Sequence, residues 1–252
     1  MEDVRQAAVA ARIPGAAALG LVAPASSAVV PATALADARW TSEVLRLRSR
    51  SLRTRDRRVL ATVWWYSAAS VLLTPVLAGL ATGTPLSARL ADLSLILAPD
   101  GLPVAAVARA PGDDPAADLE AALAGVVAAV AEAGDMRKRP LWAIATDSLA
   151  NRLLAVGRAV GDVAAATALA GPLAAAVGAP LPAPRYVDVP TPSGGAVRFT
   201  RRASCCLLYR LPHEVVCTSC PRRDPAQREV LLADEAERLG TSGPFRRPPP
   251  RP

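Results

Sequence analysis

All four cysteines of this 252-residue chain lie in one short stretch, SCCLLYRLPHEVVCTSC. They are Cys205, Cys206, Cys217 and Cys220, so their spacing is C-C-x10-C-x2-C and no cysteine is left over. Four thiols are the ligand number of one four-thiolate metal centre, which can be an iron–sulfur cluster or a zinc site. The stretch therefore predicts metal binding by thiolates.

Structural disulfides are a weaker explanation of the same residues. Adjacent cysteines cannot bridge each other without strain, and disulfide frameworks belong mainly to small secreted domains. The first residues, MEDVRQAAVAARIP, are acidic and then alanine-rich, without the compact apolar core of a secretory signal. We therefore favour a metal centre over disulfides.

Zinc and a two-iron cluster remain as alternatives at this stage. Structural zinc sites usually present two C-x2-C hooks, and only the segment from Cys217 to Cys220 is such a hook. The neighbouring side chains of Cys205 and Cys206 would point to opposite faces of an extended segment. Two adjacent sulfurs reach one ion only through a bent backbone, whereas a two-iron cluster is a larger object with more ways to place its ligands.

The residues around the cysteines suit an anionic redox centre. Flanking positive charge stabilises the reduced state of an iron–sulfur cluster, and hydroxyl groups can donate hydrogen bonds to sulfur. His213 is the only histidine; because four thiolates complete the ligand set, we expect it in the surroundings and not as a ligand. The residues expected to surround the centre are Arg201, Arg202, Ser204, Arg210, His213 and Ser219.

The run RRASCCLLYR, the ten residues after Cys206 and the closing C-x2-C-P resemble the C-terminal motif of the FhuF-like ferric-siderophore reductases. The resemblance implies one [2Fe–2S] cluster held by Cys205, Cys206, Cys217 and Cys220. Fainter likeness extends upstream through VWWYSAASVLL and LWAIATDSLANRLL. The implied activity is that of an oxidoreductase, the one-electron reduction of chelated Fe(III) to Fe(II) in iron acquisition.

The implied partners are a ferric siderophore and an external electron donor, either a ferredoxin or a flavin reductase. An external donor is expected because the sequence has no G-x-G-x-x-G fingerprint between a strand and a helix. Two alternatives stay open: a non-catalytic iron–sulfur electron carrier or redox sensor, and a zinc-binding relative of siderophore proteins.

The net charge of +7 does not by itself predict nucleic-acid binding. All but one of the 29 basic residues are arginine, and the loading with Arg, Ala and Pro is typical of a GC-rich coding bias. No RNA- or DNA-binding signature accompanies the charge, so we expect no nucleic-acid partner.

The densest basic run, RLRSRSLRTRDRR, precedes an aromatic triplet. The run can offer an electropositive surface to an anionic ferric chelate or acidic donor, can attract an anionic membrane, or can be a solvated connector. The triplet fits a buried core best and could instead line a substrate cleft. The candidate substrate-docking residues are Arg57, Arg58, Trp64, Trp65 and Tyr66.

The charge-free run over residues 59–88 is long enough for a transmembrane helix, but threonines, serines, Pro75 and Pro85 interrupt it. We therefore expect a buried helix from about Arg57 to Thr74, followed by a second short one. The expected location is cytoplasmic, with peripheral attachment to the inner face of the membrane as an alternative.

The remaining patterns predict an α+β fold. Residues 1–35 suggest a helix followed by a loop. The further expected elements are a hairpin turning at Pro99–Gly101, helices from Pro115 to Gly134, from Leu141 or Thr146 to Val160 and from Val163 to Val177, a second hairpin turning at Ser193–Gly195, and a helix from Pro225 to Gly240.

The proline-rich GAPLPAP is the clearest linker in the chain. We expect a predominantly helical, FhuF-like N-terminal domain over residues 1–184 that docks the siderophore. A small C-terminal hairpin-and-helix domain for the [2Fe–2S] cluster would cover residues 185–240, and a disordered Pro/Arg tail residues 241–252.

Overall fold

The computed structural model describes residues 4–24 and 28–241. The α-helices are α1 (Val4–Ala11), α2 (Ala38–Ser51), α3 (Arg57–Ala81), α4 (Pro115–Ala133), α5 (Lys138–Val160), α6 (Val163–Ala168), α7 (Ala170–Val177) and α8 (Pro225–Thr241). The strands are β1 (Ala28–Pro31), β2 (Leu93–Leu97), β3 (Pro103–Ala108), β4 (Tyr186–Pro190) and β5 (Ala196–Thr200). Short 3-10 helices are η1 (Ala32–Ala36), η2 (Leu90–Asp92) and η3 (Leu208–Arg210). The predicted α+β class is confirmed.

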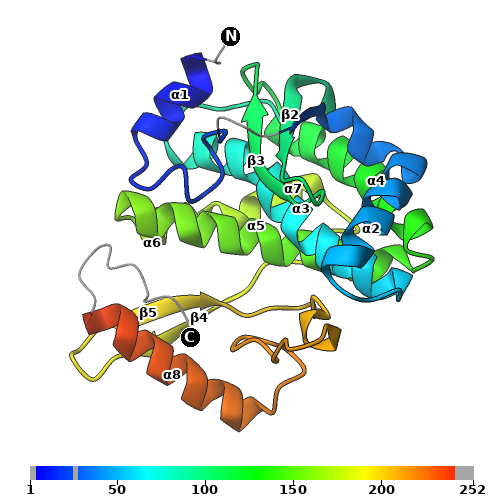
Figure 1. Ribbon diagram of the computed structural model, residues 1–252. Coiled ribbons are helices and arrows are strands. Elements are labelled where there is room, and N and C mark those ends of the chain that lie inside the picture. Colours follow the sequence, from blue (N-terminus) through cyan, green and yellow to red (C-terminus); the bar gives the residue numbers. More distant parts are fainter. Residues whose placement is uncertain (1–3, 25–27, 242–252) are drawn as a thin grey trace.

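The elements form a larger helical body and a smaller hairpin-and-helix unit that lies beneath α5 in Figure 1. Helix α3 crosses the body and packs along α5, and α4 and the three-stranded sheet lie around this pair. In the smaller unit, α8 packs on the antiparallel hairpin of β4 and β5, and β5 contacts α5. The cysteine stretch connects β5 to α8 within the smaller unit, and its η3 contacts α3 of the larger body.

Helix α3 is the centre of the apolar core. The carboxylate of Asp56 accepts the backbone N–H of Val59 and caps its start. Trp64 and Trp65 are completely buried, and their indole N–H groups donate to the carbonyls of Gly101 (3.2 Å) and Leu141 (2.9 Å). Burial of these large rings contributes strongly to the stability of the body.

The prediction that this helix ends at Thr74 is wrong, because α3 continues through Pro75 to Ala81. A proline inside a helix removes one backbone donor. Here the cost is offset by burial, since Thr74, Pro75 and Leu77 all lie inside the core. The Thr74 hydroxyl also donates to the Ser70 carbonyl (2.7 Å) one turn earlier.

Within the described part of the chain, α3 is the one helix long and apolar enough to cross a membrane by length and composition. However, 78% of its apolar window is buried inside the protein. Most of its apolar side chains pack inside the core, so the prediction of a buried helix is confirmed.

The first sheet has the order β1-β2-β3 and is antiparallel throughout. The predicted hairpin is confirmed as β2 and β3, and Gly101 adopts a positive φ of 80° at its turn. The expectation of only a helix and a loop before residue 35 missed β1, which pairs with β2 from Ala28 to Pro31. Its four residues are too few for a recognisable alternating pattern.

The helices predicted from Pro115 and after Asp224 are confirmed, and the second hairpin is confirmed as β4 and β5. The helix expected to begin at Leu141 or Thr146 begins earlier, at Lys138, and the one expected over residues 163–177 is divided into α6 and α7. Residues 178–184, the predicted linker, form no helix or strand. The division into two domains at residue 184 stays a prediction, and the proposed tail lies outside the described residues except for Thr241 in α8.

Candidate metal centre

The cysteine pair Cys205–Cys206 sits directly before a sharp turn of the backbone. Leu207 adopts the left-handed conformation, with a φ of 60°, and η3 follows. The backbone N–H of Leu207 donates to the sulfur of Cys205, and that of Leu208 donates to the sulfur of Cys206. This is the bent backbone that two adjacent sulfurs need in order to serve a common centre.

The four thiols are arranged as two facing pairs. The sulfurs of Cys205 and Cys220 are 3.7 Å apart, and the thiols of Cys206 and Cys217 interact directly. Among the described residues, no three cysteine, histidine or acidic side chains surround one point as ligands of a single ion. Two facing pairs are the ligand arrangement of a two-iron cluster, in which each iron takes two thiolates.

The pKa values of the free thiols reflect this pairing. The hydrogen bond between Cys206 and Cys217 is the largest influence on both: it lowers the pKa of Cys206 and raises that of Cys217. The nearby Arg202 guanidinium lowers the pKa of Cys206 further. Burial raises the pKa of Cys205. Deprotonation therefore begins at Cys206, which faces the arginine.

Arg202 is the buried cation of the site. Its side chain is only 3% exposed, and one terminal nitrogen lies 3.3 Å from the Cys217 sulfur and 4.0 Å from the Cys206 sulfur. Its guanidinium also stacks over the Tyr66 ring, 4.8 Å from the ring centre. Burial lowers the pKa of Arg202, but the facing Tyr66, Cys206, Cys217 and Asp147 outweigh it, so the net shift is upward. The guanidinium stays charged beside the sulfurs.

Asp147 of α5 is a site residue that sequence reasoning missed. Its buried carboxylate accepts the backbone N–H groups of Ala203 (2.8 Å) and Ser204 (2.9 Å) and the Ser204 hydroxyl (2.5 Å). It also lies 3.6 Å from the Nε of Arg202. The one available signal was its position in LWAIATDSLANRLL, a segment noted for its family likeness. A buried carboxylate inside an apolar helix needs partners, and here they come from the cysteine loop.

The aromatic triplet divides between the core and the site. Trp64 and Trp65 are fully buried, so the expectation that they dock substrate is wrong; both rings fill the core. Tyr66 is half-buried beneath Arg202, and burial raises its pKa. Arg152, from α5, interacts electrostatically with Tyr66 and has a buried Nε without a hydrogen-bond partner. Tyr66 therefore lines the metal centre through its contact with Arg202.

The rest of the loop is fastened to the two flanking elements. Leu211 packs against Val59 and Val63 of α3. The Arg223 guanidinium donates to the carbonyls of Val216 and Cys217 (3.4 Å for Cys217), and thereby ties the C-x2-C hook to the start of α8. The Leu211 contacts hold the loop against α3, and the Arg223 hydrogen bonds hold the C-x2-C hook to the residue that precedes α8.

The other residues expected around the centre lie farther out. Arg201 and His213 are exposed, and Ser219 is half-buried; within the described chain none of them makes a side-chain hydrogen bond to a cysteine sulfur. Arg210 forms an exposed ion pair with Asp56, 3.8 Å apart, at the start of α3. Ser204 is buried, and its hydroxyl donates to the Asp147 carboxylate and not to a cysteine sulfur.

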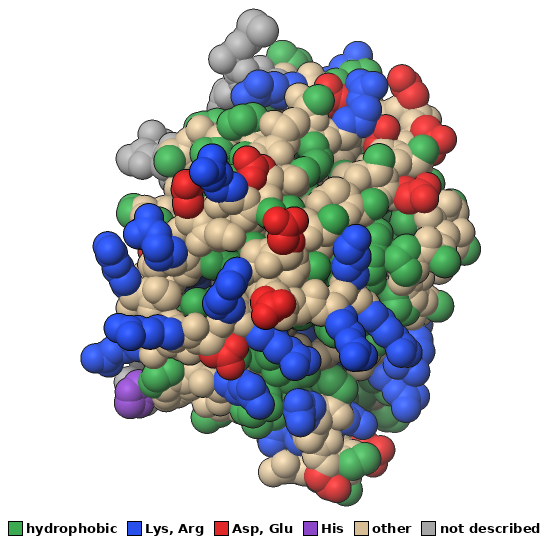
Figure 2. Space-filling view, turned by 90° about the vertical axis from the view of Figure 1, so that its right-hand side faces the viewer, with side chains coloured by type: hydrophobic (Ala, Val, Ile, Leu, Met, Phe, Trp, Pro, Cys, Tyr) green, Lys and Arg blue, Asp and Glu red, His purple; other side chains and the backbone are tan. Residues whose placement is uncertain are grey.

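The arginine-rich turn between α2 and α3 lies next to the cysteine loop, because the Arg210–Asp56 pair and the Leu211 contacts join the two. Figure 2 shows Lys and Arg side chains predominating over the lower half of the face on this side of the molecule. Arg58 is exposed, and Arg57 is exposed but turns back to donate to the Ala133 carbonyl (2.8 Å).

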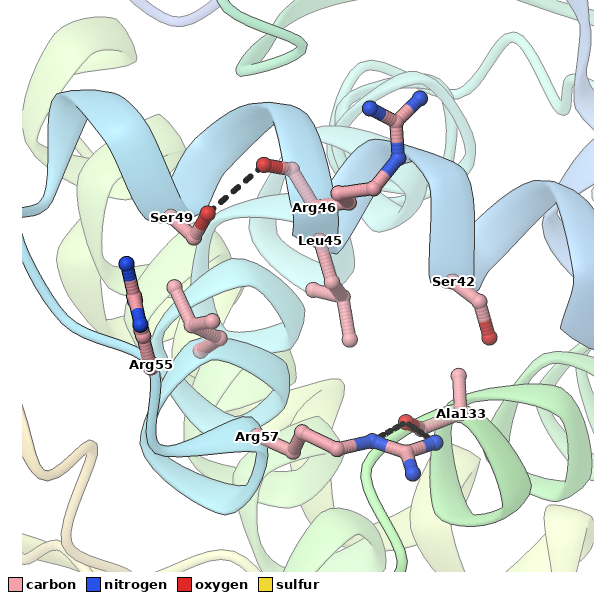
Figure 3. A pocket seen from close by; sticks show the side chains of 8 residues that line it. Ser42, Leu45, Arg46, Ser49, Arg55, Arg57 and Ala133 are labelled. Carbon is pink, nitrogen blue, oxygen red and sulfur yellow. Dashed lines mark hydrogen bonds between the residues drawn. The ribbon is translucent and has the colours of Figure 1, made fainter.

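That turn borders a shallow cavity of about 270 Å³, shown in Figure 3. Arg57 runs along its floor, and Arg46 points away from it. It is smaller than the roughly 300–1,000 Å³ of pockets that enclose drug-sized ligands. Its lining residues are Ser42, Leu45, Arg46, Ser49, Arg55, Arg57, Leu60 and Ala133. The cavity is therefore too small to enclose a bulky ligand.

The buried polar atoms of the site fit an anionic metal–sulfur group. Arg202 keeps two nitrogens, Nε and one terminal nitrogen, with no hydrogen-bond partner. Buried donors without partners are costly. The Nε faces the Asp147 carboxylate 3.6 Å away, so the terminal nitrogen is the donor that an anionic group bearing sulfur acceptors could satisfy. The donor set, four thiolates facing a fixed guanidinium, is suited to an iron–sulfur cluster.

Comparison with protein families agrees with this geometry. Residues 202–222 match the model of the FhuF 2Fe-2S C-terminal domain, and no curated protein matches the chain. The match confirms the family resemblance drawn from the motif and identifies the cofactor as a [2Fe–2S] cluster. The chain is accordingly an iron–sulfur protein of a kind associated with siderophore-bound iron.

Proposed function

We propose that this protein is a cytoplasmic ferric-siderophore reductase that delivers one electron to chelated Fe(III). The observation that carries the proposal is the arrangement of the four thiols as two pairs. These thiols lie beside an arginine-rich surface, in the segment that matches the FhuF 2Fe-2S domain. The proposed ligands are Cys205 with Cys220 for one iron, and Cys206 with Cys217 for the other. When bound, a [2Fe–2S] cluster accepts and releases single electrons.

The chain's own residues supply position, charge and access. Cys205 and Cys217 are half-exposed, which brings the centre close to the surface where a chelate can approach. Arg202 places a fixed positive charge at one sulfur pair. Backbone N–H groups of Leu207 and Leu208 donate to sulfur and, like the arginine, favour the more negative, reduced state. No general acid, base or nucleophile is required.

The net reaction transfers one electron from an external donor, a ferredoxin or a flavin reductase, to the ferric chelate. Hydroxamate, catecholate and phenolate oxygens hold hard Fe(III) far better than Fe(II), so the product iron exchanges out of the chelate. We propose that the exposed arginines of the α2–α3 turn, Arg58 above all, attract the anionic chelate or donor. The same charge would draw the protein to an anionic membrane surface.

The decisive experiment follows the reoxidation of anaerobically reduced protein by a panel of ferric siderophores, with a ferrous-specific chelator trapping the product. We expect stoichiometric Fe(II), one per cluster, and rates that differ between chelate classes. If small inorganic oxidants and all chelates react alike, or if no Fe(II) appears, the protein is an electron carrier or redox sensor. A colourless protein with one zinc and no acid-labile sulfide would overturn both.

The docking role of the α2–α3 turn is tested separately with Arg58→Gln. Removal of one steering charge should slow reduction of an anionic chelate by about threefold to tenfold at low ionic strength and by less in salt. The matched control is Arg89→Gln, because Arg89 is an exposed arginine paired with Asp92 beside β2. Equal slowing in both variants would show a general charge effect and reject a specific docking turn.

A further inference from the structure

One buried carboxylate accepts three hydrogen bonds and pairs with one guanidinium, all from three consecutive residues just before the cysteine pair. Asp147 accepts from Ala203 and Ser204 through both of its oxygens and lies against the Nε of Arg202. Its side chain is only 2% exposed. A carboxylate inside an apolar helix is expensive unless it is fully bonded, so its presence here calls for a role in the loop that it binds.

The helix that carries Asp147 is among the most firmly held elements of the fold. Helix α5 packs along α3, and the Ser70 and Ser148 hydroxyls meet at 3.4 Å between the two helices. The cysteine loop, by contrast, has no regular structure between β5 and η3. The hydrogen bonds of Asp147 therefore fix residues 203 and 204 to a rigid helix, in a segment that has no backbone hydrogen bonds of a strand to hold it.

Arg202 depends on this anchor for its place beside the sulfurs. Its guanidinium is held on one side by the Tyr66 ring and on another by Asp147, and it meets the sulfurs of Cys206 and Cys217 at the remaining edge. Its neighbour Arg201 lacks these contacts and is exposed. Without the carboxylate, the buried charge of Arg202 would lose its one close carboxylate partner and would be drawn towards solvent.

We propose that Asp147 is the positioning residue of the redox centre: it fixes residues 202–204 so that Arg202 keeps its charge at the Cys206–Cys217 edge. The inference rests on the ligand assignment proposed above but not on the substrate. Asp147 acts through Arg202 and does not itself touch a sulfur. Its own negative charge opposes reduction, and its positional effect favours reduction, so the two effects have opposite signs and can be separated.

The test is a double-mutant cycle read out by the reduction potential of the reconstituted protein. Arg202→Gln should lower the equilibrium constant for reduction by about tenfold, which is 59 mV for one electron. Asp147→Asn should lower it too when Arg202 is present. In the Arg202→Gln background the same change should raise the constant, because only the loss of a negative charge then remains.

Asp188→Asn is the matched control, since Asp188 pairs with Arg198 in the same hairpin unit, at 2.7 Å, away from the thiols. It should leave both cluster content and potential unchanged. If Asp147→Asn raises the constant equally in both backgrounds, Asp147 is only a nearby charge and the proposal is overturned. An unchanged potential in both backgrounds overturns it as well.

Loss of the cluster from Asp147→Asn is also informative. If the variant keeps its far-UV circular dichroism yet takes up less iron and sulfide than Asp188→Asn during reconstitution, the positioning role is supported. Ser204→Ala removes one of the donors and should retain the cluster with a smaller shift of potential in the same direction. Failure of the ligand assignment would be seen separately, as full cluster content in Cys206→Ser.

Discussion

Oxidation of the metal-free protein is expected to join the cysteines in two defined pairs, Cys205 with Cys220 and Cys206 with Cys217. The sulfurs of the first pair are 3.7 Å apart, and those of the second pair lie 4.0 and 3.3 Å from the same terminal nitrogen of Arg202. A thiol oxidant such as diamide removes two electrons and two protons from each pair and forms one S–S bond. The products report the pairing on which the two-iron assignment rests.

Loop length sets how strongly folding should favour a matched disulfide over the same disulfide in the unfolded chain. The matched partners are fifteen and eleven positions apart in the sequence. A crosslink of this length restricts the unfolded chain by about 3 kcal/mol. By the thermodynamic cycle, folding favours each matched disulfide by the same amount, which is on the order of 100-fold in its equilibrium constant.

Double variants isolate each pair. Cys205→Ser with Cys220→Ser leaves the matched pair Cys206 and Cys217, whereas Cys205→Ser with Cys217→Ser leaves the mismatched pair Cys206 and Cys220. Equilibration with reduced and oxidised glutathione, with and without urea, gives the disulfide constant of each variant in the folded and unfolded chain. Trypsin places the two cysteine groups on separate peptides, residues 203–210 and 211–222, so mass spectrometry detects the crosslink.

The mismatched variant closes a loop of nearly the same length, fourteen positions, so chain entropy alone cannot separate the two. Only the folded geometry can favour the matched pair. Equal disulfide constants for matched and mismatched variants in the folded protein would refute the two-pair arrangement and with it the structural argument for a two-iron cluster.

Three further outcomes follow from the site and the core. Cys206→Ser should lose the visible absorption and acid-labile sulfide of the cluster. Its far-UV signal should stay helical, because the core around α3 and α5 does not contain the cysteines. Ser219→Ala is the control and should keep the cluster. Tyr66→Phe should retain the cluster as wild type does, whereas Tyr66→Leu should release iron to a chelator several-fold faster, since loss of a desolvated cation–π contact costs about 1–2 kcal/mol. Trp65→Ala should destabilise the protein by about 3–5 kcal/mol in urea unfolding without shifting the cluster absorption of the folded protein, as expected for a core residue that does not bind substrate.

The local patterns of the sequence predicted most of the elements and the position of the metal centre. Cap residues, turn glycines and the proline-rich linker act over a few residues, so they can be recognised without knowledge of the fold. The helix after Asp114 and both hairpins follow such signals. The continuation of α3 through Pro75 could not be predicted, because burial in the core and not local propensity decides it.

The contacts that complete the site are long-range, and the sequence does not show them. Arg201 and Arg202 are identical in type and adjacent in sequence, yet one is exposed and the other buried. Alternate side chains of an extended segment face opposite ways, and only the position of α5 determines which of the two meets a carboxylate. Asp147 is 55 positions before Arg202 in the sequence, so no spacing rule connects them.

The two upstream segments with faint family likeness acquire a physical reason in the structure. VWWYSAASVLL lies in α3 and supplies Tyr66, and LWAIATDSLANRLL lies in α5 and supplies Asp147. Both side chains meet at Arg202, which begins the 21 residues matched by the family model. The cysteine motif carries the ligands, but a helix pair of the larger body holds its buried cation. The metal centre is therefore a product of both parts of the chain, and its electrostatics depend on how the cysteine loop packs against α3 and α5.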